Sequence, residues 1–224
     1  MRTMIQPARR PVHLLVALAM FAGGCTSMQT VRVKSEFRFG IAPEVKRETK
    51  IAILIDSTAR DFRMEQKKSA MGFTTITKVP VGLVLSQASA EAIQRSFPVR
   101  VVDSAAQADS VGELVFQIRF GPGTSFKLGN TTLSKQEATI QLNAILYDAN
   151  RNITWKTSVT ETRDARRAGT AAAGALLGGI LGGSMSRSAY LGAMETAVRL
   201  ALQASLETLL VQLENQIKAS PAPR

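Results

Sequence analysis

The amino-acid sequence predicts an α+β fold, in which helices cover one face of a two-layer domain built on a mixed or antiparallel sheet. Several short segments alternate apolar and polar residues with a period of two, which is typical of half-buried strands. Residues 188–218 instead repeat apolar residues at a three-to-four spacing, which is typical of a long amphipathic helix. The roughly 200 residues after residue 24 suffice for one hydrophobic core.

The N-terminal half supplies three expected strands. The first alternates apolar with charged residues, the second is a continuous apolar run suited to the centre of a sheet, and the third is a weaker segment rich in Thr and Ile. These strands are residues 31–39, 51–55 and 73–79. The polar and charged segments between them, residues 43–50 and 57–69, are assigned to loops, the second with room for a helical turn.

A helix is expected directly after the third strand. Pro80 suits its start because the missing N–H is not needed in the first turn. Apolar residues recur at helical spacing through residues 81–97, and Pro98 ends the element. A short strand at residues 99–102 and a turn at residues 104–109 follow.

The C-terminal half supplies three further strands before the long helix. They cover residues 113–120, 134–147 and 153–162. Residues 121–123 break the first of them, and residues 148–152 form a turn that makes the other two an antiparallel hairpin. Residues 219–224 contain two prolines and are expected to be a disordered tail.

Residues 1–24 have the parts of an export signal. Three arginines precede an apolar stretch, residues 12–21, and Ala22 and two glycines supply the small residues that a signal peptidase needs. The apolar stretch is shorter than the roughly 20 residues of a spanning helix. Cys25, the only cysteine, follows at once. A plain signal peptide with an unrelated cysteine and an uncleaved membrane helix remain alternatives.

This arrangement resembles the lipobox of bacterial lipoproteins, although that family usually has Leu where this chain has Ala22. The resemblance implies that the leader, residues 1–24, is removed and that Cys25 carries a diacylglyceryl group and a further acyl chain such as palmitate. It also implies a lipidated tether at residues 25–30 and a single periplasmic domain at residues 31–218. Because no Asp follows the cysteine, it implies anchoring in the outer membrane, with the domain facing the periplasm.

Composition restricts the chemistry of the mature chain. The chain has 28 Lys and Arg against 17 Asp and Glu, and three of the arginines lie in the leader, which leaves 25 against 17 and a net charge of +8. A basic surface favours anionic partners such as lipid head groups or lipopolysaccharide. Nucleic acid is not expected, because the chain is exported and no aromatic residues interleave with the basic ones.

The mature chain would contain neither histidine nor a free thiol, because His13 is the only histidine and lies in the leader. The usual general base, cysteine nucleophile and zinc ligands are therefore missing. The sequence predicts no enzyme, no catalytic residue, no metal and no cofactor. Asp56, at the end of an apolar strand, is interpreted as the start of a turn.

Residues 168–186 are uncharged and repeat small residues at intervals of four. On a helix, Gly174, Gly178 and Gly182 would form a seam that lets a second helix approach closely, as in a glycine zipper. Such a helix is poor in water, because each Gly costs about 1 kcal/mol relative to Ala. Three interpretations stay open: a helical insertion that packs on the domain or a neighbour, a membrane-touching helix that self-associates, and a disordered loop.

Several further segments resemble the YajG-like lipoproteins and related envelope-accessory lipoproteins. They are VGLVLSQA at residues 81–88, Val101-Val102-Asp103, ELVFQI at residues 113–118, the hairpin turn at residues 148–150 and the long C-terminal helix. The resemblance covers most of residues 50–215, and the glycine zipper departs from it. It implies a non-enzymatic role in envelope assembly, transport or secretion.

The resulting expectation is a non-enzymatic, membrane-anchored lipoprotein whose periplasmic domain binds another envelope protein through a sheet edge and the long helix. One alternative is an oligomeric, membrane-inserting lipoprotein that uses Gly174, Gly178 and Gly182 as its helix–helix seam. The other alternative is a protein that binds anionic lipid or lipopolysaccharide directly.

Overall fold

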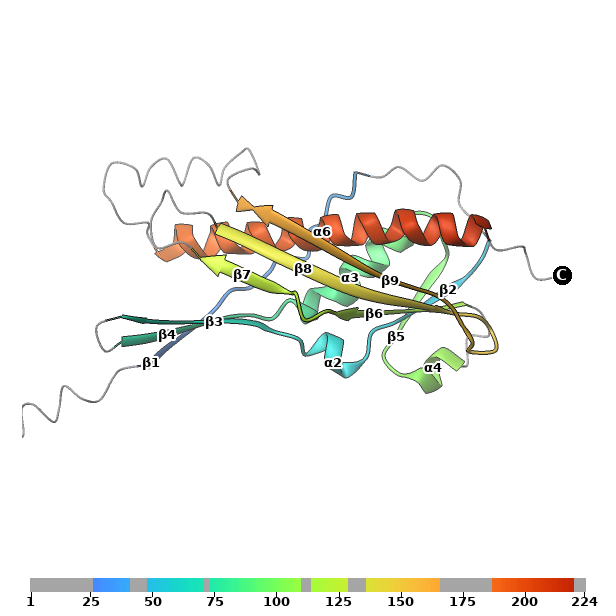
Figure 1. The fold of residues 1–224 in the computed structure, drawn as a ribbon, viewed down its shortest axis with the longest axis horizontal. Helices are drawn as coiled ribbons and strands as arrows, with labels where there is room; N and C mark the ends of the chain where they lie inside the picture. Colours follow the sequence, from blue (N-terminus) through green and yellow to red (C-terminus); the bar gives the residue numbers. More distant parts are fainter. Residues whose placement is uncertain are drawn as a thin grey trace, which may run out of the picture.

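The computed structural model describes residues 26–40, 48–70, 73–109, 114–128, 136–165 and 187–219. The described fold is α+β, with two mixed sheets and a long C-terminal helix (Figure 1). This confirms the predicted fold class. The predicted glycine-zipper segment, residues 168–186, lies outside the described residues.

The larger sheet begins with three parallel strands in the order β5-β2-β6. They are β2 (Ile51–Leu54), β5 (Val99–Val102) and β6 (Leu114–Phe120). Because β2 is a central strand, all four of its residues are buried, as its continuous apolar run predicts.

The antiparallel half of this sheet is organised around β8 (Gln136–Tyr147). On one side, β8 pairs with β6 and then with β7 (Ser125–Leu128). On its other side it pairs along its length with β9 (Ile153–Asp164), as the predicted hairpin requires. Burial alternates strictly along β8, so its even-numbered residues enter the core.

The smaller sheet is a three-stranded arm that extends from the body (Figure 1). Its order is β1-β4-β3, with β1 (Thr26–Thr30) parallel to β4 (Phe73–Val79) and β3 (Met64–Ala70) antiparallel to β4. The strand predicted at residues 73–79 is therefore confirmed, while β1 occupies most of the stretch expected to be a tether.

Helices cover the body mainly on one face. The helices α3 (Gly82–Ile93) and α6 (Arg187–Ala219) pack against each other and over β5, β8 and β9, and they enclose the main apolar cluster. Both helices are confirmed close to their predicted bounds. The five-residue helix α4 (Ala105–Asp109) replaces a predicted turn and covers a small second cluster on the opposite face of the sheet.

Two predictions about the N-terminal half are wrong. Residues 31–39 alternate in burial as a strand would, but they join no sheet. Residues 57–69 contain the helical turn for which the loop assignment left room, α2 (Ser57–Arg60), but they are not otherwise a loop, because they include most of β3. The sequence of β3, MEQKKSA, lacks apolar alternation, since the arm in which it lies buries little of its surface.

Candidate functional site

The extended segment at residues 31–40, here called the strap, lies along α6 and is held by side chains of that helix. Main-chain N–H groups of the strap donate to Glu195, Gln203 and Glu207, with Gly40 N 2.8 Å from Glu207 Oε1 and Lys34 N 3.2 Å from Glu195 Oε1. The helix also donates in return, since Arg199 Nη1 lies 3.5 Å from Glu36 O.

The geometry of the two elements explains this match. Four residues of an α-helix rise about 6 Å, and two residues of an extended chain rise about 6.6 Å. Polar side chains at every fourth position of α6 therefore meet alternate residues of a strap that runs in the same direction. The helix carries this spacing at Glu195, Arg199, Gln203 and Glu207. This four-residue polar repeat is visible in the sequence and could have identified the contact.

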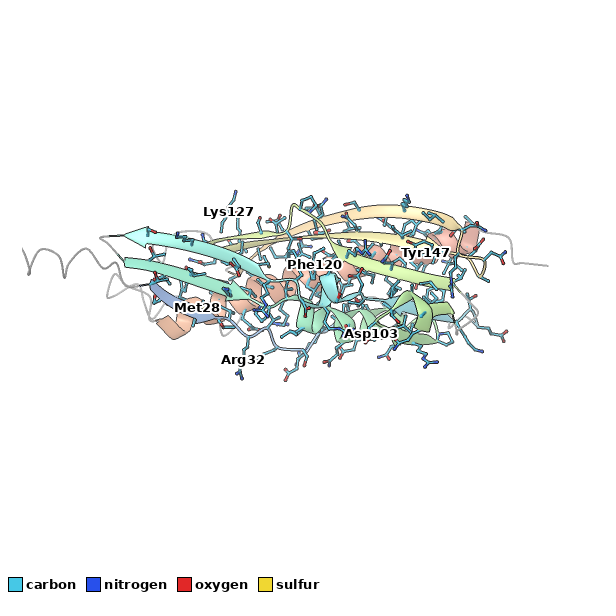
Figure 2. The ribbon with its side chains drawn as sticks, turned by 90° about the horizontal axis from the view of Figure 1, so that it is seen from below. Met28, Arg32, Asp103, Phe120, Lys127 and Tyr147 are labelled. Atoms are coloured by element: carbon cyan, nitrogen blue, oxygen red, sulfur yellow. The ribbon has the colours of Figure 1, made fainter. Side chains whose placement is uncertain are left out.

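The apolar side chains of the strap enter the core. Val31 and Phe39 are buried, and Phe37 stacks on Phe39 with ring centroids 5.9 Å apart. Arg95 closes the end of the strap, because its guanidinium lies 5.5 Å from the Phe39 ring centroid and its Nη1 donates to Phe39 O at 2.6 Å. In Figure 2 the Arg32 side chain points outward, away from the body of the domain.

The charged groups at the carboxyl end of β2 hold neighbouring elements of the fold together. Asp56 caps α2, since its Oδ1 accepts from Ala59 N at 3.0 Å, which confirms its interpretation as a turn residue. Its Oδ2 accepts from Arg119 Nε at 2.7 Å. The Gln117 amide fills the space between Arg119 and the Tyr147 hydroxyl, 3.1 Å from the hydroxyl. Each group thus has a structural partner.

The turn between β8 and β9 has the predicted geometry. Arg151 has φ 66°, and Asn152 N donates to Asp148 Oδ1 at 2.8 Å. The side-chain hydrogen bond from Asn152 holds the pKa of Asp148 below its ordinary value, with smaller contributions from main-chain hydrogen bonds and Arg151. On α6, burial raises the pKa of the Tyr190 phenol to about 12.

The exposed surface offers strand edges and single apolar side chains. Five large apolar residues of the described chain are exposed: Met28, Leu83, Val101, Ile153 and Val211. They lie on five different elements, and isolated exposed apolar residues are ordinary in proteins. The most exposed, Leu83 at 65%, lies in the first turn of α3. On the opposite side of the molecule from Arg32, Lys127 of β7 also points outward (Figure 2).

The sequence-predicted site residues Cys25, Gly174, Gly178 and Gly182 lie outside the described residues, so the lipid site and the helix seam stay predictions. What the structure adds is that β1 begins at Thr26, the residue after Cys25. Within the described ranges no helix is long and apolar enough to cross a membrane. The same ranges contain no cluster of three or more His, Cys, Asp or Glu suited to a metal ion.

No protein-family model and no curated protein matches this chain. Among solved structures, PelC from Paraburkholderia phytofirmans, a dodecamer, is similar over 74% of this chain and 94% of its own, with 17% identity and a TM-score of 0.33. A minor lipoprotein from Acinetobacter baumannii is similar over 76% and 93%, with 12% identity and a TM-score of 0.32. A hypothetical protein from Chlamydia trachomatis covers 78% and 100%, with 8% identity and a TM-score of 0.44. These likenesses assign the chain to no family.

Proposed function

We propose that this chain is a non-enzymatic outer-membrane lipoprotein, anchored through Cys25, whose periplasmic domain binds other envelope components. The observation that carries the proposal is the start of β1 at Thr26, directly after the cysteine that follows the small residues of the leader. An acyl anchor on Cys25 is then joined to a paired strand, so the anchor holds the arm at the membrane surface.

The strength of such an anchor depends on the number of acyl chains. Each buried methylene contributes about 0.8 kcal/mol, and a single chain binds a membrane only marginally. The lipobox resemblance implies two or three chains, which hold a protein durably. β1 continues directly into the strap, and side chains of α6 hydrogen-bond to the strap. The anchor would therefore be linked to the body through a paired strand and a hydrogen-bonded segment.

The surface of the domain favours binding over chemistry. The polar groups at the carboxyl end of β2 serve as a helix cap, an ion pair and their supports. The remaining candidates for a binding surface are the exposed strand edges and the single exposed apolar side chains, of which Leu83 is the most exposed. An exposed strand edge is a feature to which a partner protein can add a strand, and Leu83 gives a probe position on the exposed surface.

The anchor is tested in a Gram-negative host that expresses the full chain with a C-terminal epitope. An alkyne-labelled palmitate should label the wild-type chain and should not label Cys25→Ser, which should move to the soluble periplasmic fraction. A matched control, Cys25→Ser with Ser27→Cys, keeps one cysteine but moves it away from the leader junction and should also stay unlabelled. Labelling of Cys25→Ser would refute the anchor, and so would an unlabelled wild-type chain.

The binding role is tested by photo-cross-linking in intact cells. A photoreactive residue at Leu83 should give a covalent adduct with another envelope protein, since this side chain projects from α3. The same residue at Ala88, which is buried on the same helix, is the control and should give none. Equal adducts from both positions, or none from Leu83, would contradict the proposed docking.

A further inference from the structure

The long edge strand β9 directs one row of main-chain groups away from the sheet. Gln141 of β8 directs its main-chain N–H and C=O groups toward the β6–β7 side of the strand. Its O accepts from Gly121 N at 2.8 Å, and its N donates to Thr124 Oγ1 at 3.0 Å. In an antiparallel ladder, neighbouring residues point in opposite directions. Ile140 and Leu142 therefore direct theirs to β9, where they pair with Glu161 and Val159.

It follows that the even-numbered residues of β9 from Lys156 onward, beyond the irregularity near its start, point their N–H and C=O groups outward. In the described chain no other strand pairs with this side of β9. The outward row comprises Lys156, Ser158, Thr160 and Thr162, whose side chains are all exposed on the face opposite α6. One carbonyl of the row, that of Thr162, accepts from Arg163 Nη1 at 3.0 Å.

The middle of β9 lacks the devices that protect a sheet edge from pairing. Such devices are charged side chains, above all lysines, together with inward-pointing charges, prolines, bulges and short strands; the one lysine of β9, Lys156, lies outside its central four residues. β9 is twelve residues long, and its one irregularity in the ladder lies near its start, opposite Leu146 and Tyr147. Its central residues, Thr157–Thr160, are uncharged and mostly β-branched, which favours strand pairing. The edge β5, by contrast, has four residues and follows Pro98.

We propose that β9 pairs antiparallel with β9 of a second copy of this chain, across a two-fold axis at Thr160. The contact is isologous, so each pair occurs twice. Centring on Thr160 places Lys156 opposite Asp164 of the second copy and opposes no like charges. Centring on Ser158 or Val159 forms no ion pair, and centring on Glu161 sets two carboxylates face to face. Centring on Thr162 sets Glu161 opposite Arg163, but these two side chains already form an ion pair within one chain.

The dimer continues the larger sheet from one copy into the next. Strand pairing alone buries less than the roughly 800 Å² per partner of a standard interface. We therefore expect a weak dimer in dilute solution, strengthened when anchoring holds both copies in one membrane and raises their effective concentration. Only this strengthening rests on the proposed anchor at Cys25.

The test is disulfide formation at the two-fold axis in the full chain in cells, whose periplasm is oxidising. Two Thr160→Cys residues would face each other as a hydrogen-bonded pair with Cα atoms about 5.5 Å apart, within disulfide range. Ser158→Cys is the matched control, because its two copies would be offset by four residues, about 13 Å. The wild-type chain controls for Cys25.

A disulfide-linked dimer from Thr160→Cys alone is the expected result. Equal dimer from Ser158→Cys, no dimer from either, or a disulfide to a different protein would overturn the proposal. The same lanes probed for palmitate labelling report separately on the anchor, so its failure is distinguishable from failure of the pairing.

A charge variant gives a second readout in the purified full chain in detergent, concentrated until the weak wild-type dimer forms; a wild-type chain that stays monomeric at every concentration would overturn the pairing. Thr160→Lys sets two lysines face to face on the axis and should shift the mass measured by light scattering to one copy per particle. Thr160 is exposed, so the melting curve should stay unchanged. Val101→Lys adds the same charge to the opposite edge strand β5 and should keep the dimer. A dimer that survives Thr160→Lys would overturn the pairing.

Discussion

Gln203→Leu should detach the strap from α6 without disturbing the helix. The Gln203 amide makes two hydrogen bonds to the main chain of Arg38: its Nε2 donates to Arg38 O, and its Oε1 accepts from Arg38 N at 3.4 Å. It also donates to Glu207 Oε1 at 3.2 Å, which orients the next side chain along the helix. Leucine has a helix propensity close to that of glutamine, so the helix itself should be unaffected.

The expected loss follows from these bonds. Each hydrogen bond contributes about 0.5–1.5 kcal/mol net, and water can replace part of each bond because Arg38 is exposed. We therefore expect the free energy of unfolding to fall by about 1–2 kcal/mol. With a urea m-value of about 2 kcal/mol/M, the midpoint should fall by about 0.5–1 M.

The assay combines urea denaturation with amide hydrogen exchange. Exchange at Arg38 and Gly40 should accelerate in Gln203→Leu, because the strap opens locally before the body unfolds. Asn215→Leu, on the exposed side of the same helix, is the control and should change neither quantity. Equal effects of the two substitutions, or slow exchange at Arg38 in Gln203→Leu, would refute the role of α6 in holding the strap.

Three further predictions concern other parts of the chain. Gly82→Ala should lower stability by about 2 kcal/mol or more in thermal denaturation, because the added Cβ would lie 2.2 Å from the carbonyl oxygen of Arg60; an unchanged melting temperature would contradict this. Because the pKa of Asp148 is lowered in the folded state, its contribution to stability is present above its ordinary pKa of 3.8 and is lost as the pH falls through the folded-state pKa. Asn152→Ala should therefore flatten the loss of stability at acid pH, and an unaltered loss would exclude Asp148 as its source. Gly178→Leu should dissolve a larger homo-oligomer if the glycine seam builds one and should leave the mass unchanged if it does not, as light scattering in detergent would show.

Local patterns were sufficient for much of the fold. β8 and α6 carry long, regular apolar periodicities, and the residues on the faces that these periodicities predict are buried in the core. Pro80 and Pro98 bracket α3 closely. Asp56 was recognisable as a turn residue, since it directly follows an apolar strand and Asp is a preferred helix N-cap residue.

The candidate site depended on contacts that are distant in sequence. The strap has the alternation of a strand, but its partner is a row of helix side chains more than 150 residues away. β3 was missed because Met64 is its one described side chain in the core and the rest of its described sequence is polar, so the strand shows no apolar alternation.

By itself, the sequence determined the fold class and the principal strands and helices, and it predicts a lipid site at Cys25. Periodicity and local chemistry encode these features, because burial of one face and the rules of leader processing act on neighbouring residues. Only the tertiary structure decided that residues 31–40 lie on α6 and that β1 begins at Thr26. It also decided that β9 is an edge strand. Strand order and the choice of pairing partner depend on which distant segments can pair with the same strand edge. The residues of one segment alone therefore do not specify its partner.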